Sequence, residues 1–271
     1  MVRQSVSLLC LVVSSTLGVA ACGNDSARGP ARARADQIPV QVAVDRATLT
    51  YGFYTSRNRS TFDVGAFRIA KWPTTVAEYR QCVEAGACTE PAKNACLVRD
   101  SGALVHSDHH GGDRLPLTCA GVAQARAYCA WVGGALPTLT QWMLAARGRE
   151  VTRFAWGNKL PQCEHRPDVL QPDGARPCEE ANKASFEVGR HPAGASPFGV
   201  EDVLLTPGEL IAPSMDAPVA SCAAPFGACV AYGVRPGAID SVAPVEVARA
   251  DHGERSPHPY AFRCAFSGDS K

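Results

Sequence analysis

The sequence predicts a domain of short strands and three helices, followed by a loop-rich half that disulfide bonds hold together. The alternation of Val40, Val42 and Val44 predicts an early strand, and residues 62–69 predict further short strands. Three segments with helical periodicity follow, and two of them begin with an N-terminal capping signal. After Asn158 the chain is rich in Pro and Gly and shows little regular period. A loop-rich half of this kind needs cross-links, and the chain has cysteines to supply them.

The first helix begins at Thr75, because the Thr75 hydroxyl and Glu78 have the spacing of a capping box. Its predicted buried stripe contains Val76, Tyr79 and Val83. Gly86 ends it, since glycine readily adopts the left-handed conformation that stops a helix.

The second helix extends from about Gly121 to Val132, and the third begins at Thr138. The second is followed by two glycines, and its predicted apolar face comprises Val122, Ala125, Cys129 and Val132. The third has a capping box between Thr138 and Gln141 and ends at Gly148. Its predicted inward side chains are Trp142, Ala145 and Ala146.

The N-terminus has the features of an export signal. Arg3 provides a positive start, and residues 6–21 are small or apolar without a charge, which is short for a membrane span. The sequence Val19-Ala20-Ala21-Cys22 has the form of a lipobox, so we expect cleavage before Cys22 and lipidation of its thiol. A plain secretory signal with an incidental cysteine is the alternative. Gly23, rather than an aspartate, follows the cysteine, which favours the outer membrane.

These features divide the chain into a signal peptide over residues 1–21, a lipidated flexible tether over 22–42 and a domain over 43–268. The tether is rich in Gly, Ala, Arg and Ser and has no apolar period. The whole chain has 271 residues and a net charge of +1, which gives no support for nucleic-acid binding.

The cysteines indicate a disulfide framework. Of the 12 cysteines, Cys10 leaves with the signal and Cys22 is the predicted lipid site. An even number in an exported chain is typical of disulfide bonding. Zinc binding is the alternative, but no pair has the two-residue spacing of a zinc knuckle. The cysteines of the framework are Cys82, Cys88, Cys96, Cys119, Cys129, Cys163, Cys178, Cys222, Cys229 and Cys264.

An ordered series of motifs runs from the second helix to the end of the chain. They are Ala127-Tyr128-Cys129-Ala130-Trp131, Leu136-Pro137-Thr138, Trp142, Ala145-Ala146-Arg147-Gly148, Ala155-Trp156-Gly157-Asn158, Val188-Gly189, Pro192, Gly194, Ser196-Pro197, Gly199, Asp202 and Phe262-Arg263-Cys264. In order and spacing the series resembles the formylglycine-generating enzyme (sulfatase-modifying factor) family, over about Ala43 to Phe266.

The resemblance implies an α+β domain with the formylglycine-generating-enzyme-like fold, which is related to C-type lectins. It also implies a disulfide between Cys129 and Cys264, and the tryptophans of the motifs, Trp131, Trp142 and Trp156, as core anchors. The remaining pairs follow from proximity alone, and the sequence leaves their connectivity open. By that criterion they are Cys82–Cys88, Cys96–Cys119, Cys163–Cys178 and Cys222–Cys229.

The copper chemistry of the family is not expected here. Active members place two cysteines between an Arg-Gly-Gly-Ser segment and the terminal Phe-Arg-Cys, and copper(I) suits such thiolates. The nearest equivalent segment is Arg235-Pro236-Gly237-Ala238, and no cysteine lies between it and Cys264. The resemblance therefore argues against copper and assigns no catalytic residue.

A calcium site is a possible cofactor site implied by the resemblance. Its ligands would correspond to the side chains of Asp202 and Glu209 and the backbone carbonyls of Leu205 and Pro207. The alternative is a solvated loop with two acidic residues. Asn182 could belong to the family's other calcium site, but its acidic partner is not evident.

Other sites have weaker support. The histidines of residues 106–113 could bind a metal, but they lie in a Gly-rich stretch where surface exposure is the more ordinary interpretation. A related branch of the fold uses non-haem iron, but it needs a separate helical region with a histidine-rich motif, for which this chain has no room. No nucleophile-elbow spacing is present.

We therefore expect a membrane-anchored, non-catalytic domain that acts as a binding or structural module at the cell envelope, in the periplasm or at the cell surface. Its partner would be an unknown protein or small-molecule ligand, recognised by variable loops on a rigid scaffold. Two alternatives stay open: an oxidoreductase of the formylglycine-generating type with an altered active site, and a scaffold that pairs with another envelope protein.

Overall fold

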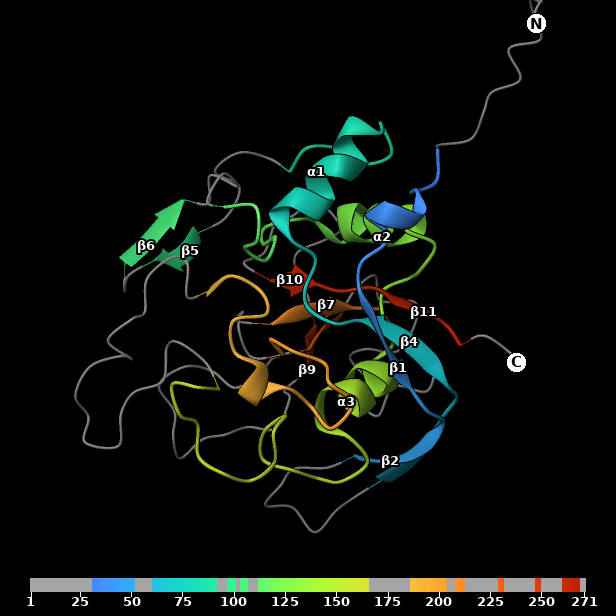
Figure 1. The fold of residues 1–271 in the computed structure, drawn as a ribbon, viewed down its shortest axis with the longest axis vertical. Coiled ribbons are helices and arrows are strands. Elements are labelled where there is room, and N and C mark those ends of the chain that lie inside the picture. The colour runs from blue at the N-terminus through green and yellow to red at the C-terminus, as the bar shows by residue number, and fades with distance from the viewer. Residues whose placement is uncertain are drawn as a thin grey trace, which may run out of the picture.

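The computed structural model describes residues 31–51, 60–91, 97–100, 103–106, 112–165, 186–203, 208–212, 229–231, 247–249 and 260–268. In these residues the chain forms three α-helices, two short 3-10 turns and eleven strands (Figure 1). The helices are α1 (Val76–Glu84), α2 (Val122–Trp131) and α3 (Leu139–Arg147). The strands are β1 (Gln41–Val44), β2 (Ala47–Tyr51), β3 (Ser60–Val64), β4 (Phe67–Ala70), β5 (Leu97–Asp100), β6 (Ala103–His106), β7 (Glu209–Ile211), β8 (Cys229–Ala231), β9 (Val247–Arg249), β10 (Ala261–Phe262) and β11 (Ala265–Ser267). The mixture of helices and strands confirms the predicted fold class.

Two sheets organise the centre of the molecule. One has the order β1-β4-β11, so strands from the two ends of the chain flank β4 with antiparallel pairing. The other has the order β10-β7-β8-β9, in which β10 and β7 are parallel. Hairpins β2–β3 and β5–β6 complete the described strands. In Figure 1, α1 and α2 lie together on one side of these central strands and α3 lies on the other.

All three predicted helices are confirmed, and two begin at the predicted capping boxes. The Thr75 hydroxyl accepts from the Glu78 backbone N–H at 3.2 Å, and the Thr75 N–H donates to the Glu78 carboxylate at 2.8 Å. Thr138 and Gln141 make the equivalent pair of bonds in α3. Gly148 follows α3 at φ 82°, a conformation that glycine adopts without steric cost.

One detail of the first helix differs from the prediction. Val83 is half-buried, and Cys82 takes the buried position beside it at 0% exposure. The reason is the disulfide: Cys82 bonds to Cys88, which draws that edge of the helix into the core.

The folded part begins earlier than the predicted tether boundary at residue 42. Residues Ala35–Gln37 form a 3-10 turn, and β1 begins at Gln41. The Ala33 N–H donates to the carbonyl of Trp131, the last residue of α2, at 3.0 Å. The final carbonyls of a helix have no hydrogen-bond donor within the helix, and the N-terminal segment supplies a donor for one of them. The periodicity of apolar residues cannot predict a hydrogen bond between two backbone groups that are far apart in the sequence.

The core divides into two clusters on either side of the central strands. The first surrounds α3 and contains Leu139, Trp142, Met143 and the inward side chains of β1–β4. The second surrounds α1 and α2 and contains Tyr79, Tyr128, Phe262 and the cysteines of the Cys82–Cys88 and Cys129–Cys264 disulfides. None of the helices among the described residues is long and apolar enough to cross a membrane.

Candidate functional site

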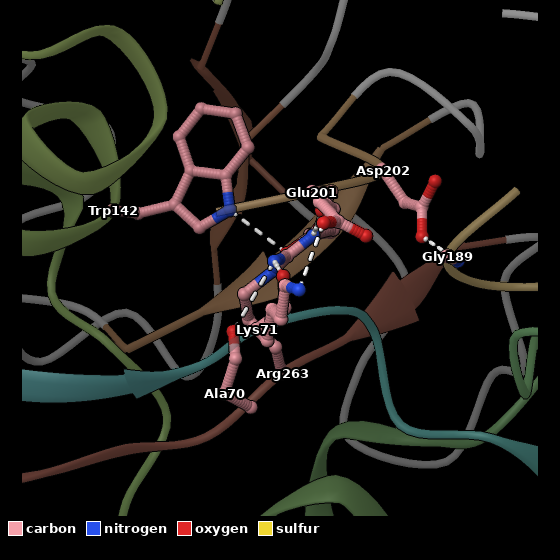
Figure 2. Close-up of polar contacts among 8 residues, drawn as sticks. Ala70, Lys71, Trp142, Gly189, Glu201, Asp202 and Arg263 are labelled. Atoms are coloured by element: carbon pink, nitrogen blue, oxygen red, sulfur yellow. Dashed lines mark hydrogen bonds and ion pairs between the residues drawn. The ribbon is translucent and has the colours of Figure 1, made fainter. Parts of the chain in front are cut away.

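The guanidinium of Arg263, which follows β10, forms a dense set of buried hydrogen bonds. It lies between the two core clusters at 1% exposure (Figure 2). Its Nε and Nη2 donate to the two carboxylate oxygens of Glu209, both at 2.7 Å. Nη1 and Nη2 also donate to the backbone carbonyls of Ala70, Lys71 and Glu201, at 3.3, 3.0 and 3.1 Å respectively.

Glu209, the first residue of β7, is the counter-ion at this centre. Its side chain is fully buried, and its Oε2 also accepts a hydrogen bond from Trp142 Nε1 at 2.9 Å. The carboxylate therefore accepts three hydrogen bonds, two of them in the bidentate geometry that makes Arg–carboxylate pairs strong. We call Arg263, Glu209 and Trp142, with the carbonyls of Ala70, Lys71 and Glu201, the Arg263 cluster. It connects β4, α3, the turn at residue 201, β7 and the C-terminal segment.

The Arg263 cluster orders these segments but presents no reactive group. A buried ion pair of this kind tolerates its desolvation because every charged atom has a partner. Nearer the surface, Lys71 Nζ lies 2.9 Å from Glu201 Oε1, with side-chain exposures of 34% and 8%. Trp72 lies at that edge, with the charged groups of Lys71 and Arg114 within 6 Å of its ring.

Asp202 is the strained acidic group beside this centre. Its backbone has φ 58°, an unusual conformation for a residue other than glycine. Its Oδ2 accepts from the Gly189 N–H at 2.7 Å, whereas its buried Oδ1 has no hydrogen-bond partner among the described residues (Figure 2). Burial raises the pKa of Asp202 to about 6, although the Gly189 N–H and the Arg263 charge oppose the shift.

The structure brings the two predicted acidic calcium ligands close to the same arginine but gives them different environments. Glu209 is engaged by protein donors on both oxygens and is buried, so it is not presented to a cation. The Oδ1 atom of Asp202 has no hydrogen-bond partner among the described residues, so it could coordinate a cation. Leu205 and Pro207 lie outside the described residues, as does Asn182. The calcium site therefore stays a prediction, with Glu209 the ligand that fits it least.

Two predicted disulfides are confirmed. Cys129 of α2 bonds to Cys264, at a sequence separation of 135, and Cys82 bonds to Cys88. Cys119 and Cys163 are also disulfide-bonded. Their predicted partners, Cys96 and Cys178, lie outside the described residues, as do Cys222 and the predicted lipid site Cys22, and of Cys229 only the backbone is described.

The histidine-rich segment lies mostly outside the described residues. Asp113 forms an exposed ion pair with Arg80 at 3.0 Å. His106 ends β6, and residues 107–111 lie outside the described part. Across the described ranges, no three His, Cys, Asp or Glu side chains are grouped so that they could hold a metal ion.

The predicted aromatic anchors have unequal roles. Trp142 and Trp131 are buried, at 1% and 5% exposure. Trp156 is only partly buried; its ring stacks between Phe154 and His165, with centroid distances of 4.9 and 4.5 Å.

Sequence reasoning did not identify the pairing of Arg263 with Glu209. A signal was present, because each charge lies within an apolar stretch: Ala261-Phe262-Arg263-Cys264-Ala265-Phe266 and Glu209-Leu210-Ile211. A charge in such a stretch requires a buried counter-ion. That rule predicts that a partner exists, whereas only the parallel pairing of β10 with β7 identifies which residue it is.

Comparison with known proteins places the fold. The family model described as "Sulfatase-modifying factor enzyme 1-like domain" matches residues 27–205. Hercynine oxygenase from Mycolicibacterium smegmatis is 29% identical over 188 residues, which cover 61% of this chain and 41% of that protein. Formylglycine-generating enzyme from Mus musculus is 32% identical over 122 residues, which cover 43% of this chain and 31% of that protein. The matched regions span less than half the length of these curated relatives.

Solved structures agree on the fold. PvdO from Pseudomonas aeruginosa has a TM-score of 0.55 at 15% identity, covering 86% of this chain and 95% of that one. CarF has a TM-score of 0.54 at 15% identity, covering 86% of this chain and 100% of that one. At these identities the likeness concerns the fold alone. Because the family model matches more than half of the sequence, the chain belongs to the sulfatase-modifying factor enzyme 1-like domain family.

Proposed function

We propose that this protein is a lipid-anchored, non-catalytic member of the family that acts as a binding or structural module at the cell envelope. The observation that carries the proposal is the state of its cysteines. No cysteine lies between Arg235 and Cys264, where active members of the family hold copper(I) with a thiolate pair. Every cysteine whose side chain the structure describes is in a disulfide, which removes its thiolate: Cys82, Cys88, Cys119, Cys129, Cys163 and Cys264.

The retained scaffold supports a binding role. The Cys129–Cys264 disulfide and the Arg263–Glu209 ion pair hold the end of the chain to α2 and β7. These are interactions that fix a framework, and they involve side chains too buried to meet a substrate. Loops mounted on such a rigid framework are the usual place for ligand recognition.

Oxidation chemistry is the second candidate, and the names of the relatives favour it. The relatives that match this chain include formylglycine-generating enzymes and hercynine oxygenases. Such chemistry here would require donors other than the missing thiolate pair.

One assay decides between the two. The purified mature protein is incubated with copper(I), oxygen and a sulfatase-type peptide, and in a parallel reaction with iron(II), oxygen and hercynine, and the products are measured by mass spectrometry. A formylglycine-generating enzyme that retains its cysteine pair is the positive control. We expect no product above the protein-free background. Turnover that scales with protein concentration would overturn the non-catalytic proposal.

The envelope location is tested separately. Mass spectrometry of the N-terminal peptide of the membrane-extracted protein should find a diacylglycerol-modified Cys22 as the first residue. A Cys22→Ser variant exported behind a cleavable secretory signal in place of residues 1–21 should appear in the soluble fraction. Fractionation of the two membranes should place the protein in the outer one. An unmodified cysteine would contradict the lipid anchor but would leave the catalytic question open.

A further inference from the structure

The N-terminal segment, residues 31–40, joins the predicted lipid anchor to β1 and is bound to the end of α2. The Ala33 N–H donates to the Trp131 carbonyl, and Ala33 packs against the cluster around α2. In Figure 1 the segment, in blue, lies beside α2 before it enters β1. Ala33, the bound residue, lies about a dozen positions after Cys22 along the chain.

This short connection limits how the domain can face a bilayer. An extended chain covers at most about 3.5 Å per residue, so the stretch from Cys22 to Ala33 reaches no more than about 38 Å. A compact domain of the size of residues 31–268 has a diameter of about 45 Å. The end of the domain opposite the Ala33–Trp131 contact therefore cannot rest on the lipid, which excludes the inverted orientation.

The exposed side chains of the N-terminal segment suit a lipid surface. Ile38 and Val40 are 39% and 55% exposed, and the third large exposed apolar side chain in the described ranges is Leu160. Arg32 and Arg34 are exposed in the same segment. Arg34 lies 3.4 Å from Asp36, but both side chains are about three-quarters exposed, so that pair is weak and leaves the arginine free to meet a phosphate. Basic and apolar side chains together are typical of segments that lie at an anionic membrane interface.

We propose that residues 31–40 and the C-terminal end of α2 form a membrane-contacting surface that takes the headgroups of an anionic bilayer. This inference rests on the lipidation of Cys22 in the proposed function. The surface supplies a second, weaker contact beside the lipid anchor, and it orients the domain so that α3 and the β2–β3 hairpin point away from the bilayer.

Hydrogen–deuterium exchange of the lipidated protein tests this surface. The protein is reconstituted into vesicles of phosphatidylcholine with a quarter phosphatidylglycerol, and its exchange is compared with that of the unlipidated Cys22→Ser protein in solution. We expect peptides covering 31–42 and 126–134 to exchange more slowly on the vesicles than in solution. Peptides from β2 and β3 should exchange equally in both samples.

Variants separate the apolar contribution from the charged one. The Ile38→Ser, Val40→Ser double variant should lose the protection on vesicles, whereas Leu160→Ser, the matched exposed apolar control, should keep it. The Arg32→Gln, Arg34→Gln double variant should show the same protection with or without phosphatidylglycerol.

Two results would overturn the surface in distinguishable ways. Equal exchange in vesicles and solution, with a lipid-modified Cys22 verified by mass, would refute the surface and leave the anchor in place. A Cys22 that carries no lipid in the membrane-extracted protein would refute the anchor and the orientation derived from it.

Discussion

The cluster around α3 and the cluster around α1 and α2 are stabilised by different means. The α3 cluster contains aliphatic and aromatic side chains and no cysteine among its described members. The α1–α2 cluster contains two disulfides and a group of aromatic rings, in which Tyr79 and Tyr128 are 5.8 Å apart. Burial raises the pKa of both tyrosines far above the ordinary value, so both stay neutral. One cluster therefore depends on packing, and the other adds covalent cross-links.

The segment from β10 to β11 joins the two clusters. Phe262, Cys264 and Phe266 belong to the α1–α2 cluster, whereas Ala265 belongs to the α3 cluster. Arg263 lies between them with Glu209. This alternation follows from the two faces of an extended chain. The end of the chain, rather than any of the helices, therefore couples the two halves of the core.

The largest expected effect comes from opening the Cys129–Cys264 disulfide. Chain-entropy arguments assign about 5 kcal/mol to a bridge across 135 residues and about 2 kcal/mol to the six-residue Cys82–Cys88 bridge. The double alanine variant at each bridge should therefore lower the free energy of unfolding unequally, as measured by denaturant titration. Equal losses at the two bridges would contradict the entropic explanation.

Removing the Arg263 side chain should lower the free energy of unfolding nearly as much as opening the Cys129–Cys264 disulfide. Arg263→Met leaves the carboxylate of Glu209 buried without its counter-ion, and we expect a loss of about 4 kcal/mol in the free energy of unfolding. The double variant Arg263→Met, Glu209→Leu should recover much of that loss, because it removes both charges. Arg80→Ala, which breaks an exposed ion pair, is the control and should change stability by less than about 1 kcal/mol. If the double variant is as unstable as the single one, the loss does not come from the unpaired charge of Glu209, and the prediction is wrong.

Replacing Asp202 should stabilise the protein at neutral pH. Because burial raises the pKa of Asp202 from 3.8 to about 6, the folded state binds an extra proton between these values, and stability falls as the pH rises from 4 to 6. Asp202→Asn is neutral at every pH and tolerates positive φ. It should gain about 3 kcal/mol over the native protein at pH 7 and little at pH 4. Denaturant titrations at both pH values measure this, with the exposed Asp36→Asn as control. A gain that does not depend on pH would assign the effect to backbone strain.

The smallest effects concern the helix caps, one in each cluster. Thr75→Ala in α1 and Thr138→Ala in α3 each remove a side-chain bond to a backbone N–H, and each should cost about 1 kcal/mol. Thermal unfolding of the two variants measures the loss, with Thr75→Ser and Thr138→Ser as controls that retain the hydroxyl. A much smaller loss at Thr75 would show that the nearby Cys82–Cys88 bridge already holds α1 in place.

The elements that the sequence predicted are those with local causes. Both capping boxes, the terminating Gly148 and the alternating strand residues act within a few positions of one another, so their effect can be read along the chain. The Cys129–Cys264 bond was predicted too, through the resemblance of its motifs to a family. The lipidation of Cys22 is likewise a prediction from local sequence, and the structure does not describe that residue.

The sequence alone thus determined the helices, their caps, the family and the absence of a cysteine pair before the terminal Phe-Arg-Cys. Tertiary structure decided that Glu209 is the counter-ion of Arg263, that the Asp202 carboxylate accepts a hydrogen bond from the Gly189 N–H, and that Ala33 binds the end of α2. The physical reason is that a buried charge or an unpaired backbone group requires a partner, but sequence separation does not restrict where it comes from. Only the paths of the strands bring such partners within bonding distance.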